Sequence, residues 1–206
     1  MSPDAATSPG ELRYRLRCID KLGHEFRGDE RLLDVGCGDG GVASLLHERV
    51  AEVIAVDVEP SDEWADAPGL QFQVANGEQL PFGDGEFDLV HSKDSLHHMD
   101  DPARALAEYR RVLKPGGTAL IVEGNRYNPL FFVHMTKLLG HEHFPQKHFQ
   151  GLVRAVFPSA RFGSFEAHYV PGTERLARVQ HAVEEGLEHL PGFRRLLSYN
   201  FAVSSR

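Results

Sequence analysis

The run LLDVGCGDGG, from Leu32 to Gly41, places an apolar strand, a glycine-rich turn and the start of a helix in direct succession. Glycine is needed in such a turn because a ligand lying against the backbone would meet a Cβ, and the helix that follows offers unpaired amide groups. Gly36, Gly38 and Gly41 also satisfy the short dinucleotide-binding pattern, which occurs in many proteins. The run therefore predicts a cofactor at the end of a strand without identifying it.

The charge of Asp34, two residues before the first glycine, separates two classes of cofactor. A carboxylate at this position would repel a pyrophosphate held in the turn, whereas S-adenosylmethionine has no phosphate and brings an ammonium and a sulfonium. We therefore expect S-adenosylmethionine rather than a nicotinamide dinucleotide. The competing interpretation is a solvated loop carboxylate, which is unusual at a strand end beside a glycine turn.

Short runs rich in β-branched residues alternate along the chain with stretches of helical spacing. The expected strands are 31–35, 52–56, 70–75, 87–91, 118–123, 161–170 and 197–203. The expected helices are 11–26, 41–49, 62–67, 102–113, 128–139, 147–157 and 173–189. Strands that alternate with helices predict a parallel sheet with helices packed on its faces.

Two further positions fit a nucleoside at the same edge of the sheet. Asp57 ends the second expected strand, 19 residues beyond Gly38, where an acidic side chain reaches ribose hydroxyls in such folds. Asn76, Gly77 and Glu78 end the third expected strand, where an amide side chain and a close backbone can contact an adenine edge. A capping aspartate and a plain turn are the respective alternatives.

The segment HSKDSLHH, from His91 to His98, follows the fourth expected strand at the carboxyl edge of the sheet, where doubly wound folds bind ligands. Methyl transfer from a sulfonium needs a positioned acceptor and exclusion of water, and it needs a base only when the acceptor atom is oxygen or carbon. His97 is the first candidate for that base and Asp94 the second, while His98 contacts substrate or packs under the next helix. A structural role for both histidines is the competing interpretation.

Residues after the fifth expected strand are candidates for binding the acceptor. Asn125, Arg126 and Tyr127 mix hydrogen-bonding and aromatic groups at the same sheet edge, although a capped loop entering a helix is equally consistent with them. Tyr14 on the leading helix and His134 in the later part of the chain complete the predicted substrate set. The 13 phenylalanines, several of them in that later part, favour an apolar or aromatic acceptor.

One group of histidines raises the question of a metal ion. Its members are His134, His141, Glu142, His143 and His148. Imidazole and carboxylate groups suit zinc or iron, but the spacing matches no metal-binding motif. We therefore expect no metal, and interpret the group as a polar surface or as part of an acceptor pocket.

Composition excludes several classes of partner. The formal net charge of −8 provides no basic face for nucleic acid and argues against an anionic membrane surface, so a small-molecule partner fits better. Neither an export signal nor a membrane-spanning stretch is expected. Cys18 and Cys37 are isolated and predict no disulfide, which favours a reducing, cytoplasmic location.

Several motifs together resemble the class I S-adenosylmethionine-dependent methyltransferases, in particular the type 11 group that includes quinone-ring methylating enzymes. The motifs are LLDVGCGDG, VDVEP and VANGEQLPFGDGEFDLVHSKDSLHHMDDPARALAEYRRVLKPGGTALIVE, which cover Arg31 to about Glu123. The resemblance implies a three-layer, Rossmann-like α/β methyltransferase fold, with a seven-stranded and mostly parallel sheet whose last strand is antiparallel.

The resemblance also implies which residues bind the donor. The predicted set is Asp34, Gly36, Cys37, Gly38, Asp57, Val58, Asn76, Gly77, Glu78 and Ser92. The residues of the glycine turn and Ser92 hold the methionine portion, the acidic residue after the second strand holds the ribose, and the three residues after the third strand surround the adenine. The chain departs from the family at Asn76-Gly77, where Asp-Ala is more common, and at Lys93, where a small or polar residue is usual.

We therefore expect one domain over residues 1–206, with a leading helix in 1–30, a cofactor-binding core in 31–124, and an acceptor-side cover with the terminal strands in 125–206. The expected activity is methyl transfer from S-adenosylmethionine to a small-molecule acceptor. Two alternatives stay open: a nicotinamide-dependent oxidoreductase that uses the same glycine turn, and a non-catalytic S-adenosylmethionine-binding regulatory protein. Asp34 disfavours the first, and the second stays open because no base is unambiguous.

Overall fold

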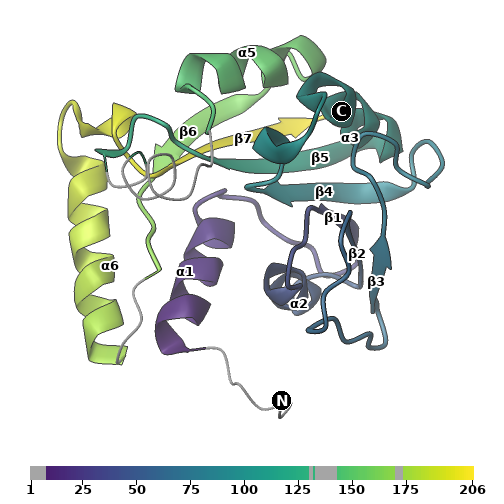
Figure 1. The fold of residues 1–206 in the computed structure, drawn as a ribbon, viewed down its shortest axis with the longest axis horizontal. Helices are drawn as coiled ribbons and strands as arrows, with labels where there is room; N and C mark the ends of the chain where they lie inside the picture. Colours follow the sequence, from purple (N-terminus) through teal and green to yellow (C-terminus); the bar gives the residue numbers. More distant parts are fainter. Residues whose placement is uncertain (1–7, 130–131, 133–142, 170–173) are drawn as a thin grey trace.

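The computed structural model describes residues 8–129, 132, 143–169 and 174–206 (Figure 1). Its strands are β1 Arg31–Val35, β2 Glu52–Asp57, β3 Leu70–Val74, β4 Phe87–Lys93, β5 Leu113–Gly124, β6 Arg161–Phe165 and β7 Tyr199–Ser205. Its helices are α1 Pro9–Asp20, α2 Gly41–His47, α3 Pro102–Val112, α5 Gln146–Val156 and α6 Glu174–His189, with short 3-10 helices η1 Leu96–His98 and η3 Phe193–Arg195. Most of the helix expected at 128–139 falls outside the described residues.

The strands form one seven-stranded sheet in the order β3-β2-β1-β4-β5-β7-β6. The neighbours from β3 to β5 pair in parallel, and β7 pairs antiparallel with both β5 and β6. The predicted fold class, mostly parallel with an antiparallel last strand, is thus confirmed. The strand order reverses between β1 and β4, and in open α/β sheets ligands bind beyond the carboxyl ends of the strands at such a point.

Helices cover both faces of the sheet, which gives three layers (Figure 1). On one face Tyr109 of α3 and Phe149 of α5 are fully buried against Leu33 and its neighbours. On the other face Ile19 of α1 and Leu46 of α2 pack on the same strands. Strands β1 and β2 are buried along almost their whole length, as expected for parallel strands covered on both sides. Truncating a core side chain such as Leu33 to alanine costs about 2 to 5 kcal/mol.

The helix after η1 begins as its sequence predicts. The side chain of Asp101 accepts hydrogen bonds from the amides of Ala103 and Arg104, and Pro102 occupies the first turn. These contacts satisfy amides that have no partner inside the helix, and proline has no amide to satisfy. The start of α3 therefore fixes where the segment after β4 must end.

Two expected helices differ in the structure. The leading helix ends at Asp20, earlier than expected, because Gly23 turns the backbone with a φ of +60° and its amide bonds to the carbonyl of Asp20. The helix expected at 62–67 is an irregular turn, in which the ring of Trp64 stacks on that of Phe72 with centroids 5.5 Å apart. Tertiary contacts override helical spacing at both places.

Several expected strands also change their bounds, β5 and β6 by the most. The strand expected at 161–170 ends at Phe165, because the amide of Ala167 bonds to the hydroxyl of Ser198 instead of continuing a ladder. Strand β5 begins at Leu113, earlier than expected, since that residue already pairs with β4. None of the helices in the described part of the chain combines the length and the apolar character that crossing a bilayer requires.

Candidate functional site

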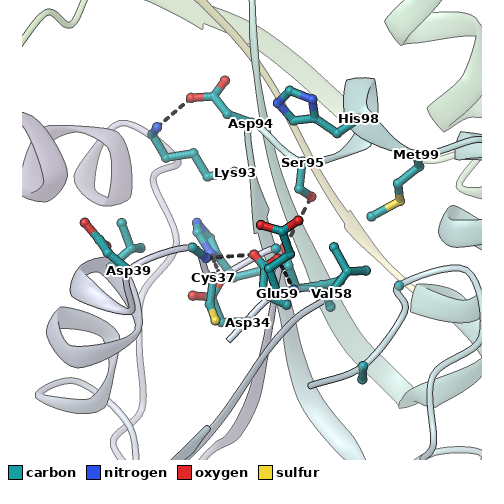
Figure 2. A pocket seen from close by; sticks show the side chains of 18 of the residues that line it. Asp34, Cys37, Asp39, Val58, Glu59, Lys93, Asp94, Ser95, His98 and Met99 are labelled. Atoms are coloured by element: carbon teal, nitrogen blue, oxygen red, sulfur yellow. Dashed lines mark hydrogen bonds and ion pairs between the residues drawn. The ribbon is translucent and has the colours of Figure 1, made fainter. Parts of the chain in front are cut away.

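A cavity of about 760 Å³ opens at the carboxyl ends of β1, β2 and β4. Its walls come from the glycine turn, the ends of the next two strands, the segment after β4 and helix α1 (Figure 2). The predicted donor residues that line it are Asp34, Gly36, Cys37, Gly38, Asp57, Val58, Asn76, Gly77 and Glu78. The lining residues from the predicted catalytic and substrate sets are Tyr14, Asp94 and His98.

The glycine turn after β1 is held in place by its neighbours. Gly36 has a φ of +76°, and a Cβ there would lie 2.2 Å from the Cβ of Ser95, so only glycine fits. The amides of Gly36 and Cys37 both donate to the carbonyl of Val56, at 2.8 and 3.0 Å, which ties the turn to β2. The position of the turn is therefore set by the adjacent strand, and its main chain forms a wall of the cavity.

The side chain of Asp34 is buried, with 2% of the residue exposed, so the solvated alternative is excluded. Its Oδ1 lies 2.7 Å from Nδ1 of His91, which is fully buried on β4. Its Oδ2 is also buried and has no hydrogen-bond partner within the described part of the chain. A buried carboxylate oxygen without a partner is costly, which suits a site that receives a cationic donor group.

The partner of Asp34 was missed by the sequence reasoning. His91 interrupts the otherwise apolar residues of β4 and stands directly beside Asp34 in the parallel register. A histidine inside an apolar strand was the available signal, but it is interpretable only once the order of the strands is known. Oδ1 of Asp34 is thus paired with His91, and Oδ2 is left without a partner in the described part of the chain.

Asp57 lies at the end of β2, as predicted, and braces the glycine turn. Its Oδ2 accepts a hydrogen bond from the amide of Gly38 at 2.9 Å, and its Oδ1 accepts one from the amide of Glu59 at 3.3 Å. The neighbouring Val58 is 62% exposed at the cavity rim. An ionised carboxylate has about four lone-pair positions, so Asp57 retains capacity to accept hydrogen bonds from hydroxyl groups.

The turn after β3 is closed by its own hydrogen bonds. The side chain of Asn76 accepts from the amide of Glu78, and the side chain of Glu78 accepts from the amide of Asp100, both at 2.8 Å. A Cβ on Gly77 would lie 2.7 Å from Cε of Met99. Glycine therefore lets Met99 pack directly against the turn, so that a polar turn and an apolar side chain line the cavity side by side.

Helix α1 brings a cation to the cavity that the sequence reasoning missed. The guanidinium of Arg15 donates to both carboxylate oxygens of Asp39, at 3.0 and 2.6 Å, and also to Glu11. Burial raises the pKa of Asp39, but the hydrogen bonds from Arg15 and from the amide of Gly41, together with the charge of Arg15, leave the pKa below its ordinary value. Helical spacing predicted this helix without indicating that Arg15 would face the glycine turn.

A second ion pair stands at the end of β4 (Figure 2). Nζ of Lys93 donates to Oδ2 of Asp94 at 2.6 Å and lies 5.0 and 5.1 Å from the ring centroids of Tyr14 and Tyr199, whose hydroxyls are hydrogen-bonded to each other. Asp94 has a φ of +51°, and its Oδ1 accepts from the amide of Gly124 at 3.0 Å. Lys93, which stands where the resembling family usually has a small or polar residue, is therefore held between a carboxylate and two aromatic rings.

Each member of this pair favours the charged form of the other. Burial lowers the pKa of Lys93, but the charge of Asp94 and the hydrogen bond to it, together with neighbouring acidic groups, hold the pKa well above the ordinary value. Burial likewise raises the pKa of Asp94, but the charge of Lys93 and its hydrogen bond, together with nearby histidines, bring the pKa below the ordinary value. A carboxylate with a lowered pKa is a weaker base, so Asp94 accepts a proton less readily while this pair is intact.

The two histidines of η1 occupy different environments. His98 lines the cavity (Figure 2), whereas His97 does not belong to the residues found lining it in the described part of the chain. Nδ1 of His97 lies 2.7 Å from Oε2 of Glu123, and its side chain is 3% exposed. Burial lowers the pKa of His97, but the hydrogen bond with Glu123 and the charges of Glu123 and Asp94 together raise it above its ordinary value. The role of His97 as a base stays a prediction.

Ser92, predicted to bind the donor, lies beneath the cavity wall. It is fully buried, and its Oγ is 2.6 Å from Oγ of Ser95 and 3.3 Å from the hydroxyl of Tyr109. Ser95 lines the cavity in its place. The serine hydroxyl at the cavity wall thus comes three residues later in the chain than expected.

The predicted acceptor residues after β5 do not line the cavity in the described part of the chain. Asn125 is fully buried, and its Nδ2 donates to the carbonyl of Leu197 at 2.7 Å, so its amide holds the chain that leads into β7. Arg126 is half-buried and Tyr127 is exposed, and neither belongs to the cavity wall. His134 lies outside the described residues.

The charge of the lining residues favours a cationic ligand. Within the described part of the chain seven carboxylic acids line the cavity, namely Asp34, Asp39, Asp57, Glu59, Glu78, Asp94 and Asp100. The lysine and arginine residues among the lining residues are Arg15 and Lys93, and each is paired with one of those acids. The remaining negative charge disfavours a pyrophosphate and favours a sulfonium with an ammonium group.

Comparison of the sequence with known proteins finds methyltransferases. Residues 33–121 match the family described as a methyltransferase domain. A demethylmenaquinone methyltransferase of Thermus thermophilus is 38% identical over 122 residues, which cover 55% of this chain and 54% of that protein. The chloroplastic tocopherol O-methyltransferase of Arabidopsis thaliana is 40% identical over 103 residues, which cover 45% of this chain and 30% of that protein. The chain thus spans about half the length of these curated relatives, or less.

The same fold is found among solved structures. A S-adenosylmethionine-dependent methyltransferase from Archaeoglobus fulgidus matches with a TM-score of 0.68 at 18% sequence identity, covering 97% of this chain and 95% of that one. At this identity the likeness is one of fold. It extends over the terminal strands and helices that the family match leaves out.

Proposed function

Because the chain belongs to the class I S-adenosylmethionine-dependent methyltransferases, we propose that it transfers the methyl group of S-adenosylmethionine to a small-molecule acceptor. The observation that carries this proposal is the buried Oδ2 of Asp34, which has no partner within the described part of the chain and stands beside the glycine turn. An ammonium group matches that oxygen in charge and hydrogen bonding, and a phosphate does not.

The remaining donor contacts follow from the groups on each wall. Asp57 would accept the ribose hydroxyls, and the turn after β3, together with Met99, would contact the adenine. Arg15 would bind the carboxylate of the methionine portion, because it is the cation beside the glycine turn. The donor supplies an activated methyl group, so the protein's contribution is to hold the acceptor in line and to exclude water.

The acceptor would bind beyond the methionine end of the donor, where Tyr14, Lys93, Asp94 and His98 line the cavity. We propose an apolar or aromatic acceptor, because aromatic side chains border this end and because relatives act on a quinone precursor and on tocopherol according to their names. An oxygen or carbon acceptor must also lose a proton. Asp94 and His97 are the predicted groups for this step, and Asp94 is the one that lines the cavity.

Binding measurements test the donor assignment. Titration calorimetry with S-adenosylmethionine, S-adenosylhomocysteine and NADH should give saturable binding of the first two and none of the third. Asp34→Asn keeps the shape of the side chain and removes its charge, so it should weaken S-adenosylmethionine by about 1.5 to 3 kcal/mol, the usual strength of a charge-assisted hydrogen bond. Preferential binding of NADH, or unchanged affinity in Asp34→Asn, would refute the assignment.

Turnover is tested separately from binding. Release of S-adenosylhomocysteine should be measured over a panel of phenols, quinols and aliphatic amines with the wild-type protein. Turnover with an aromatic member is the expected result. Tight donor binding without turnover on any member would favour a non-catalytic S-adenosylmethionine-binding protein instead.

A further inference from the structure

Three ionisable side chains converge behind the cavity wall. They are His97 on η1, Glu123 at the end of β5 and His143 in the segment before α5, and we refer to them as the His97 cluster. One ligand atom from each residue lies within 4.8 Å of the ligand atoms of the other two. All three are shielded from solvent: the side chains of His97 and Glu123 are 3% and 0% exposed, and His143 is 3% exposed.

The carboxylate of the His97 cluster is held in a fixed orientation. Oε1 of Glu123 accepts a hydrogen bond from the amide of Leu96 at 2.8 Å, which directs Oε2 toward Nδ1 of His97 at 2.7 Å. Metal ligands characteristically have such a second contact, which orients the ligand atom and tunes its basicity. Strand β5 and the start of η1 therefore present two donor atoms from a rigid part of the fold.

The third member, His143, fits beside the end of β5 because residue 124 is a glycine. A Cβ on Gly124 would lie 2.7 Å from Nδ1 and 2.8 Å from Cε1 of His143, so any larger residue would push the imidazole ring away from β5. The ring of His143 also packs on that of His97, with centroids 4.4 Å apart. Gly124 thus has a steric role that its place at a strand end would not reveal, namely to let the second imidazole reach the carboxylate.

We propose that the His97 cluster binds a divalent transition-metal ion, with zinc as the first choice. Two imidazoles and one carboxylate form a common protein ligand set for zinc and leave a further position for water. In a tetrahedral site the ligand atoms stand about 3.3 Å apart, so the close His97–Glu123 pair would open and His143 would move inward. This assignment reverses the expectation from sequence, because two of the three ligands lie outside the histidine group considered there.

A bound ion would tie the segment before α5 to the ends of β4 and β5. The ring of His98, which lines the cavity, packs on His97 with centroids 4.0 Å apart, so the ion would lie one side chain away from the acceptor end. As a ligand His97 would no longer accept a proton from substrate, and that step would fall to groups of the cavity wall such as Asp94. The ion would therefore position the acceptor side of the site without touching the donor.

Metal binding is measured directly on the full chain. Protein dialysed against a chelator and then titrated with zinc chloride by calorimetry should bind one ion per chain, and elemental analysis after gel filtration should give the same ratio. His143→Ala should weaken this binding by at least about tenfold, as loss of a ligand does. His148→Ala is the matched control, because His148 is an exposed histidine five residues further along the chain, and it should bind zinc as the wild type does.

A spectroscopic readout covers the case in which His143→Ala does not fold. Cobalt bound to the wild-type protein should give the visible absorption typical of a tetrahedral site, and zinc should displace it. Circular dichroism and S-adenosylhomocysteine binding of each variant report whether the fold and the donor site are retained. Absence of zinc binding in the wild type, or equal zinc affinity in a folded His143→Ala variant, would overturn the proposal.

Discussion

The donor end of the cavity and the C-terminal cover, by which we mean α6 and the residues that follow β6, are held in place in different ways. At the donor end the decisive contacts join main-chain groups of neighbouring strand ends, such as the amides of Gly36 and Cys37 with the carbonyl of Val56. In the cover they join side chains far apart in sequence, as where Arg17 of α1 meets Glu188 of α6 at 2.7 Å. A short motif can therefore encode the first region, whereas the second depends on the whole chain being folded.

The contact between α1 and α6 is an ionic network rather than an apolar seam. The guanidinium of Arg17 is buried, donates to the carbonyl of Glu166 at 2.6 Å, and pairs with Glu184 at 3.2 Å as well as with Glu188. Lys21 also donates to Glu188, at 2.7 Å. Because α1 also carries Tyr14 and Arg15, this network determines how that helix stands over the cavity.

The largest expected effect comes from Gly36→Ala at the donor end. The new Cβ would meet Ser95 in a backbone conformation that L-residues rarely adopt, so stability should fall by about 2 to 5 kcal/mol and donor binding should be lost. Gly116→Ala is the control, since Gly116 also has a positive φ of +80° but open space around it. Thermal unfolding and calorimetry should find in the control only the backbone cost of about 1 to 2 kcal/mol, together with normal donor affinity.

Arg17→Ala should weaken the contact between α1 and α6 and leave the glycine turn intact. Removing the guanidinium leaves Glu184 and Glu188 without their buried cation, which costs about 3 kcal/mol when a buried pair loses one partner. Lys21→Ala, which removes a more exposed partner of Glu188, should cost less than about 1 kcal/mol. Chemical denaturation measures both variants, and equal losses would mean that the network is not what joins α1 to α6.

Asp57→Ala tests the donor end of the cavity alone. Loss of the carboxylate removes its hydrogen bond with the amide of Gly38 and the bonds that we propose to the ribose, so donor affinity should weaken by about 1 to 3 kcal/mol while the fold persists. Calorimetry with S-adenosylhomocysteine gives the change. An unchanged dissociation constant would remove Asp57 from the site and leave it as a brace of the turn only.

The smallest expected effect is a pH dependence confined to the cover. Burial, together with the charges of Glu184 and Glu188, raises the pKa of Glu166 to about 7 although Ser198 donates to it. The protonated form is therefore the one that favours folding, and its contribution is complete below the unfolded pKa of about 4.5 and is lost as the pH rises through about 7.

Glu166→Gln should remove that loss. Between pH 6 and pH 8 the melting temperature of the wild type should fall more than that of the variant. The corresponding difference in the free energy of unfolding is on the order of 1 kcal/mol. Glu185→Gln changes an exposed acid of α6, 3.8 Å from Arg17, and should behave as the wild type does. A wild-type melting temperature that rises over this range relative to Glu166→Gln would contradict the assignment.

The accuracy of prediction from sequence follows the same division. The strand ends that carry Asp34, Asp57 and Asn76 were placed correctly, because apolar runs and turn residues act locally and parallel strands bring their carboxyl ends to one edge. Ser92 was displaced by Ser95 because the strand continues two residues further than its apolar pattern. Asn125 was predicted to face the acceptor and instead holds the chain before β7.

The sequence by itself determined the class of fold, the glycine turn and the preference for a cationic donor, since these rest on patterns and charges within about one strand and one helix. Only the tertiary structure decided that His91 pairs with Asp34, that Lys93 lies between Tyr14 and Tyr199, and that Glu123 meets two imidazoles. Such contacts depend on strand order and helix packing, in which residues separated by dozens of positions become neighbours. No local pattern carries that information, because the favourable energy of each pair exists only after the chain has folded.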